Sequence, residues 1–268
     1  MLGIHQSLPK KLSDLPIDAR TIGADTFQVF IRNNTNMKSR TFNQYDIDAL
    51  NTNLLNCDIH HFVVHASYAM NPCDSQQFDR CYKTMYQDLS LLRKIVGRNY
   101  YVLHPGSSKD LNPSKAIENL HNVLKSLIPV IGNTSIALEF MSGAGTQIFS
   151  DPGQIEYVMS QFTDIPNLSV CYDTCHAFAA GYDVKECYEF LNKYISVLHL
   201  NNSNALRGTH VDRHASIVKG YIPTQILLDV AEKHTVDKPN IPIILETPGP
   251  TLLSDYMFVQ DFVNKKYF

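Results

Sequence analysis

The sequence predicts an α/β fold in which eight parallel strands, each followed by a helix, close into one (β/α)8 barrel. Short apolar runs rich in β-branched and aromatic residues recur eight times along the 268 residues, and longer stretches with helix signals separate them. The runs are continuously apolar rather than alternating, as expected of strands that are buried on both faces. An open doubly wound sheet shows the same alternation and remains the alternative.

The predicted strands are these apolar runs in chain order. They are LGIH near Leu2, TFQVFI from Thr26, HFVVHA from His61, YYVLHPG from Tyr100, SIALEF from Ser135, LSVCYD from Leu168, ISVLHLN from Ile195 and IPIILET from Ile241. No linker, charged tail or low-complexity tract divides the sequence. We therefore expect residues 1–268 to form a single domain.

Helix signals fill the stretches between the runs. Leu89, Leu92 and Val96 recur at helical spacings, and prolines stand where other helices are expected to begin. These signals predict helices over Ser75–Val96 ahead of Gly97, over Ser114–Ile131 after Pro113, after Pro152, and over Thr224–Lys233 after Pro223.

The composition excludes some classes of protein. The chain has 23 Lys and Arg against 26 Asp and Glu, a formal net charge of −3, so it is not the strongly basic protein that coats DNA through a broad positive surface. An enzyme whose positive charge comes from bound metal is not excluded. The hydrophobic fraction of 44% suffices for a sizeable core.

The sequence also predicts an intracellular protein. No stretch approaches the roughly 18 consecutive apolar residues that span a bilayer, and the start MLGIHQSLPKKLSDLP lacks the order of a secretory signal. The six cysteines include no C-x-x-C pair, which favours reduced thiols. We expect no membrane association and a location in the cytoplasm or the nucleus.

Six consecutive predicted strands end in a histidine or a carboxylate. These residues are His65, His104, Glu139, Asp173, His199 and Glu246. The carboxyl ends of barrel strands all face the same way, so the six side chains should converge. Carboxylates packed together repel, whereas zinc or manganese accepts both ligand types. The sequence therefore predicts a metal cluster at the C-terminal face of the strands.

Three further candidate ligands lie close in sequence. His176 follows Asp173 by three positions in CYDTCH, and Asp212 and His214 form DRH in the loop after the seventh strand. Nine ligands are enough for more than one ion. A lone histidine or rim carboxylate is more often structural, as a hydrogen-bonded side chain or a helix N-cap. The repetition over six strands outweighs that interpretation. Four other histidines lack this placement and are expected to be structural or solvent-facing: His60, His61, His121 and His234.

Four segments resemble the signature segments of endonuclease IV, the second family of apurinic/apyrimidinic endonucleases. They are VLHPGS (Val102–Ser107), SVCYDTCHAFAAGYD (Ser169–Asp183), HLNNS (His199–Ser203) and VDRHASI (Val211–Ile217). The similarity extends from HQS near the amino end to ILET at Ile244–Thr247, nearly the whole chain.

The resemblance implies a TIM barrel that holds three zinc ions, with manganese able to replace zinc at one or more positions. The implied ligands are His65, His104 and Glu139 for the first ion, Glu139, Asp173, His199 and Glu246 for the second, and His176, Asp212 and His214 for the third. Glu139 would bridge two ions, and Glu139 and Glu246 would be the catalytic carboxylates.

The resemblance also implies an activity. The family cleaves double-stranded DNA on the 5′ side of an abasic site in base excision repair, leaving a 3′-hydroxyl and a 5′-deoxyribose phosphate, and trims blocked 3′ ends. A monomer is expected. The residues expected to contact DNA are Tyr68 at the lesion, Asn33, Asn34 and Lys38 in the loop after the second strand, Gly106 beside the DNA backbone, and Arg213 on a phosphate.

Three segments depart from the family pattern. Asn202 follows Asn201 where the family usually has an aspartate, which removes one negative charge expected to act on the metal ligands. The stretch EFMSGAG after Glu139 and the loop RNNTNMKSR after the second strand also differ. We expect the first change to shift metal affinity or the pH optimum, and the others to affect lesion preference.

Two other functions remain as alternatives. A sugar isomerase or epimerase on the same barrel also places Glu, Asp and His at strand ends, around one or two divalent ions. A non-catalytic binding module could keep zinc for stability, but closed structural zinc sites use four protein ligands each and many cysteines. The segments CYDTCH, HLN and DRH favour three metals and the nuclease.

Overall fold

A computed structural model describes residues 1–267 and confirms the closed barrel. Strand β1 pairs with both β2 and β10, so the parallel sheet has no edge and the open doubly wound alternative is wrong. The eight barrel strands are β1 (Leu2–Gln6), β2 (Thr26–Val29), β3 (His61–His65), β4 (Arg98–Leu103), β5 (Ser135–Glu139), β6 (Leu168–Asp173), β7 (Ile195–His199) and β10 (Ile243–Leu245).

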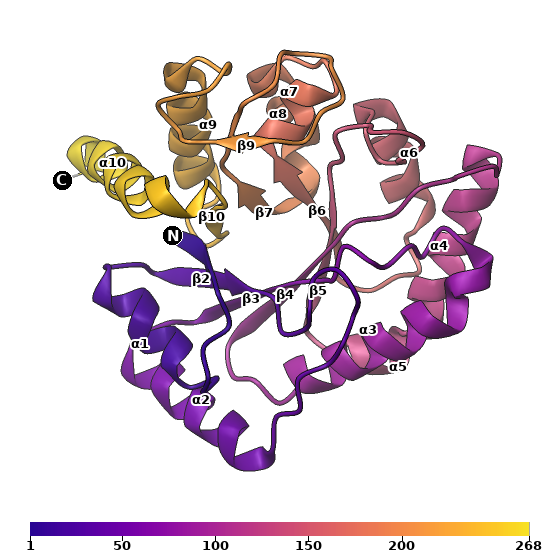
Figure 1. Cartoon of the computed structure of the whole chain (residues 1–268), viewed down its shortest axis with the longest axis horizontal. Coiled ribbons are helices and arrows are strands. Elements are labelled where there is room, and N and C mark those ends of the chain that lie inside the picture. The colour runs from indigo at the N-terminus through magenta and orange to yellow at the C-terminus, as the bar shows by residue number, and fades with distance from the viewer. Residues whose placement is uncertain (268) are drawn as a thin grey trace.

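Helices surround the strands, and the chain passes around the barrel once from its amino to its carboxyl end (Figure 1). The α-helices are α1 (Asp14–Thr21), α2 (Gln44–Asn56), α3 (Phe78–Leu92), α4 (Pro113–Ser126), α5 (Ile128–Ile131), α6 (Pro152–Gln161), α7 (Thr174–Ala179), α8 (Val184–Leu191), α9 (Thr224–Asp237) and α10 (Gly249–Tyr267). Short 3₁₀ turns, η1 (Ser75–Gln77) and η2 (Asn192–Tyr194), precede α3 and β7. Within residues 1–267, no helix is long and apolar enough to cross a membrane.

Three predicted helices differ from the observed ones, and one of these is α9, which was expected to end at Lys233 and continues to Asp237. Helix α3 ends at Leu92 rather than Val96, and the buried Asn99 side chain satisfies the carbonyls of Leu92 and Ile95 beyond that end by donating a hydrogen bond to each. The helix predicted over Ser114–Ile131 breaks at residue 127, since Pro129 lacks the N–H that would continue it. A small antiparallel pair, β8 (Asn202–Ser203) and β9 (His214–Ala215), was not predicted.

Strand alternation places the six candidate ligands at the ends of the barrel strands in one layer. An apolar cluster fills the middle of the barrel and contains Val63, Tyr100, Val102, Ala137, Cys171, Val197 and Ile244. In a strand, residues two apart point to the same side. His104 therefore follows Val102 on the inner face, and Glu139 follows Ala137 in the same way. The layer of polar side chains therefore lies next to this apolar cluster, at the carboxyl end of the strands, where barrel enzymes have their active sites.

Candidate metal centre

The nine candidate ligands make up three of the five groups of side chains in residues 1–267 that could hold a metal ion, and the other two groups add Cys171 or Cys175 to some of the same ligands. Within each group the ligand atoms are within 4.8 Å of one another. The three groups of the nine ligands are His65, His104 and Glu139; Glu139, Asp173, His199 and Glu246; and His176, Asp212 and His214. They coincide with the three ligand sets that the sequence resemblance implies.

Glu139 is the residue that the first two groups share. Its Oε2 atom lies 3.1 Å from Nε2 of His65 and 3.1 Å from Nε2 of His104. Its Oε1 atom lies 3.2 Å from Nδ1 of His199. The carboxylate is buried, and its two oxygens face different groups, which is the arrangement of a bridging ligand.

Hydrogen bonds to backbone carbonyls fix which nitrogen of three histidines carries the proton. The Nδ1 atoms of His65, His176 and His214 lie 2.7, 2.8 and 3.2 Å from the carbonyl oxygens of Ala66, Phe140 and Glu246, respectively. A carbonyl only accepts, so each Nδ1 carries a hydrogen, and Nε2 is the nitrogen that can bind a metal ion once it has no proton. The buried Nε2 atoms of His176 and His214 have no well-oriented hydrogen-bond partner and lie 3.1 and 3.5 Å from the carboxylate oxygens of Asp212. An imidazole nitrogen this close to a carboxylate needs a proton or a metal ion between the two atoms.

The charges of the site also favour a bound cation. Burial raises the pKa of Glu139, but His104 and His199 oppose burial and hold that pKa well below its usual value. Burial lowers the pKa of His199, whereas the surrounding acidic groups, Glu246 and Glu139 among them, raise it well above its usual value. The carboxylates therefore stay ionised and attract positive charge. The set of imidazole and carboxylate donors fits a divalent transition metal such as zinc.

Two residues at the site were missed by the sequence analysis. His5 on β1 donates from Nδ1 to Glu246 Oε1 at 2.8 Å, and Gln28 on β2 donates from Nε2 to the same oxygen at 2.6 Å. Gln28 Oε1 also accepts from His199 Nε2 at 2.8 Å, which leaves His199 Nδ1 to face the carboxylates. His5 ends the first apolar run, so the rule that found the other strand ends applies to it. Gln28 is a polar side chain inside the second apolar run, but the run alone does not show that it faces the site.

The hydrogen bonds of the Asn202 side chain do not reach the candidate ligands, so no direct contact supports the expected effect of its missing charge on them. The neighbouring Asn201 does contact them: Asn201 Nδ2 donates to Asp173 Oδ2 at 2.8 Å, and Asn201 Oδ1 accepts from the Glu246 N–H at 2.8 Å. Asn202 is buried beneath the loop that carries Asp212. Its Nδ2 donates to the carbonyls of Ile217 and Ile222, both at 2.9 Å, and its Oδ1 accepts from the N–H groups of Ser203 and Ile222.

Asn202→Asp is therefore expected to destabilise the fold. An aspartate would bring a buried oxygen against two carbonyl oxygens in place of an N–H donor, at about 3 kcal/mol, which corresponds to about 6–10 °C in Tm for a chain of this size. Thermal unfolding of the metal-loaded protein measures the loss. Asn204→Asp, the same change at an exposed position in the same loop, is the matched control. Equal melting temperatures for the two variants would contradict the role of Asn202.

The residues predicted to contact DNA lie around the groups. Tyr68 is 45% exposed, and its ring centroid is 5.1 Å from that of His65 and 4.9 Å from that of His104. In the loop after β2, Asn33 and Asn34 line the neighbouring cavity, whereas Lys38 does not. Arg213 is exposed and lies between Asp212 and His214. Their contacts with DNA stay predictions.

Gly106 has a structural reason to be glycine. Its φ is +112°, and a Cβ there would lie 2.1 Å from the Asn71 Oδ1 atom. That oxygen accepts from the N–H of Ser107 at 3.0 Å. Packing against Asn71 thus accounts for Gly106 whether or not DNA approaches it.

The four histidines that were left out of the site lie outside the three groups. The pairs that they form are His60 with Asp58, His61 with Tyr100, His121 with Asp164 and His234 with Tyr188. These hydrogen bonds to single side chains are typical of structural or surface histidines, which is what the sequence predicts for these four.

The barrel and the position of its polar layer define the class of protein. The model of the family described as "Xylose isomerase-like TIM barrel" matches residues 17–259. A probable endonuclease 4 of Clostridium botulinum is 30% identical over 259 residues, which cover 92% of each chain. The crystal structure of endonuclease IV from Thermus thermophilus superposes with a TM-score of 0.85 at 26% identity and covers 98% of this chain and 99% of that one.

The chain belongs to the endonuclease IV family of these barrels. A D-psicose 3-epimerase from Clostridium cellulolyticum, solved with D-tagatose, superposes with a TM-score of 0.73 at 13% identity and covers 98% of each chain. At that identity the likeness shows a shared fold alone.

Proposed function

We propose that the protein is a zinc-dependent apurinic/apyrimidinic endonuclease of base excision DNA repair. It hydrolyses the phosphodiester on the 5′ side of an abasic site, leaves a 3′-hydroxyl and a 5′-deoxyribose phosphate, and trims blocked 3′ ends. The observation that carries the proposal is the gathering of nine imidazole and carboxylate ligands into three groups in a chain of the endonuclease IV family. We further propose that residues 1–268 act as one domain, as a monomer and inside the cell.

The residues present fit three zinc ions, with manganese as a substitute at one or more positions. When bound, such ions lower the pKa of a bound water and neutralise phosphoryl oxygens. Glu139 would hold two of the groups at a fixed separation through its two oxygens. His5 and Gln28 would hold Glu246 in place from behind, so that its second oxygen faces His199. These contacts position the catalytic carboxylates before substrate binds.

Surrounding residues would recognise the lesion. An abasic sugar has no base to stack, so it leaves the duplex at lower cost than a normal nucleotide. Tyr68, partly exposed beside His65 and His104, would fill the space at the lesion. The loop with Asn33, Asn34 and Lys38 would contact the backbone.

The test is incision of a duplex that contains one abasic site, by purified protein whose metal content has been measured. We expect a single cut 5′ to the site, loss of at least about 10³-fold of the rate on metal removal by a chelator, and recovery with zinc. An undamaged duplex of the same sequence is the substrate control. Unimpaired cutting by a folded, metal-free protein would refute the proposal. Epimerisation of D-psicose without incision would favour the sugar epimerase instead.

A further inference from the structure

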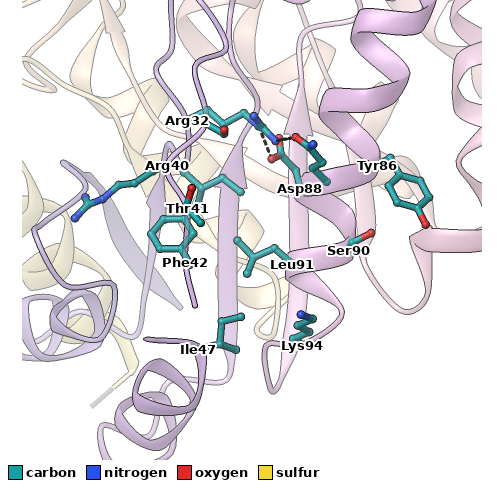
Figure 2. A pocket seen from close by; sticks show the side chains of 13 residues that line it. Arg32, Arg40, Thr41, Phe42, Ile47, Tyr86, Asp88, Ser90, Leu91 and Lys94 are labelled. Carbon is teal, nitrogen blue, oxygen red and sulfur yellow. Dashed lines mark hydrogen bonds and ion pairs between the residues drawn. The ribbon is translucent and has the colours of Figure 1, made fainter. Parts of the chain in front are cut away.

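One buried arginine holds the loop that follows β2 against helix α3. Arg32 Nε donates to Asp88 Oδ1 at 2.5 Å, and Arg32 Nη2 donates to Gln87 Oε1 at 2.8 Å (Figure 2). The two charged side chains are only 8% and 3% exposed. Arg32 Nη1 also donates to the carbonyl of Met37 at 3.3 Å, so the side chain of the residue just before the loop binds the far end of the loop.

The loop itself has a defined conformation. Asn33 Oδ1 accepts from the N–H groups of Thr35 and Asn36 at 3.0 and 3.1 Å, and the Asn33 N–H donates to the Lys38 carbonyl at 3.0 Å. Met37 has a φ of +62°, a conformation that side chains rarely adopt, while its own side chain is buried. Contacts with the rest of the protein must stabilise this backbone conformation of Met37. The hydrogen bond from Arg32 to the Met37 carbonyl is one of these contacts.

One side of this loop lies next to the candidate metal centre. The Asn34 carbonyl accepts from Ser67 Oγ at 2.9 Å, and Ser67 lies between the candidate ligand His65 and Tyr68. A cavity of about 510 Å³ extends along the same loop to His5. The position of the loop therefore determines how far its exposed polar groups lie from a substrate bound at the candidate metal centre.

Burial of the ion pair does not by itself imply that the pair stabilises the fold. Burial raises the pKa of Asp88 to about 6, although Arg32 and the Tyr101 hydroxyl, which donates to Asp88 Oδ2 at 3.0 Å, oppose the shift. Desolvation therefore outweighs the attraction between the charges. Buried pairs of this kind are often replaced by apolar side chains with no loss of stability. What an apolar pair could not replace is the hydrogen bonding that fixes the loop.

We propose that Arg32, held by Asp88 and Gln87 of α3, is a positioning residue that keeps loop residues 33–39 in the conformation that binds damaged duplex. The inference rests on the proposed function. A loop that is already ordered loses less entropy on binding, so its contribution is to affinity rather than to the chemical step.

The test replaces the buried polar cluster by apolar groups. A triple variant, Arg32→Met, Asp88→Leu and Tyr101→Phe, removes one positive and one negative charge and leaves no buried hydroxyl without an acceptor. We expect its Tm to stay near that of the wild type. Amide hydrogen exchange in residues 33–39 should become at least tenfold faster, and KM for the abasic duplex should rise about tenfold, with kcat and metal content kept within twofold.

The matched control removes an exposed ion pair. Lys115→Met with Glu118→Leu on α4 deletes the same charges at the surface and should change neither exchange in the loop nor KM. Unchanged exchange in the triple variant would overturn the inference, whether or not the protein incises DNA. Faster exchange with an unchanged KM would overturn it as well. If the wild type fails to incise abasic DNA, the proposed function is refuted instead. Amide hydrogen exchange then tests only whether Arg32 holds the loop in place.

Discussion

Glu246→Gln is expected to reduce incision of an abasic duplex by about 10³-fold or more while the duplex still binds with affinity within a few-fold of the wild type. His5 Nδ1 and Gln28 Nε2 both donate to Oε1, so the amide oxygen must take that position. The NH2 group then takes the place of Oε2, which lies 3.1 Å from His199 Nδ1. The substitution thus removes a charge and points an N–H donor at the His199 nitrogen that would bind metal.

Single-turnover incision, duplex binding and elemental analysis of the same preparation test this expectation. Glu118→Gln makes the same chemical change on the surface of α4 and should behave like the wild type. His104→Ala is expected to have a comparable effect on incision, because it removes one of the two histidines on Glu139 Oε2. Normal turnover by Glu246→Gln with a full complement of metal would remove Glu246 from the catalytic role.

The sequence predicted the barrel and most of its polar layer for one physical reason. Strands buried on both faces are apolar throughout, so a histidine or carboxylate that ends one of them is conspicuous. His104 follows Tyr100 and Val102 on the inner face at intervals of two, and Asp173 follows Cys171 in the same way. Closure of the sheet then brings together side chains that are more than a hundred positions apart.

What the sequence could not give depends on contacts that are distant along the chain. Continuous apolar runs lack the alternation that would show which face is inner, so Gln28 could not be assigned to the site. Its pairing with His5 across β1 and β2 supplies that information. Asn202 looks like a lost charge in the local motif, whereas its hydrogen bonds reach Ile217 and Ile222. The partner of Arg32 lies 56 residues away.

Arg32→Met alone is expected to lower the free energy of unfolding by about 3–5 kcal/mol at neutral pH, because it leaves the Asp88 carboxylate buried without a counterion. The effect depends on pH in a defined direction. The pKa of Asp88 is about 6 in the folded protein and about 3.9 in an unfolded chain. The folded state thus binds the Asp88 proton more tightly than the unfolded state. The contribution of this proton to the free energy of unfolding is lost as pH rises through 6.

Removal of Arg32 takes away an attraction that opposes this shift, so the pKa of Asp88 rises further. The loss in the Arg32→Met variant should therefore be largest near pH 8 and smaller near pH 5, where Asp88 is mostly protonated with or without its partner. Denaturant unfolding of variant and wild type at both pH values measures the difference, and Lys115→Met gives the effect of losing a surface cation. A loss under 1 kcal/mol, or one that is equal at both pH values, would show that Asp88 does not depend on Arg32. In that case the loop after β2 would have to be held by its remaining contacts, chiefly the buried Met37 side chain and the Ser67 hydrogen bond to the Asn34 carbonyl.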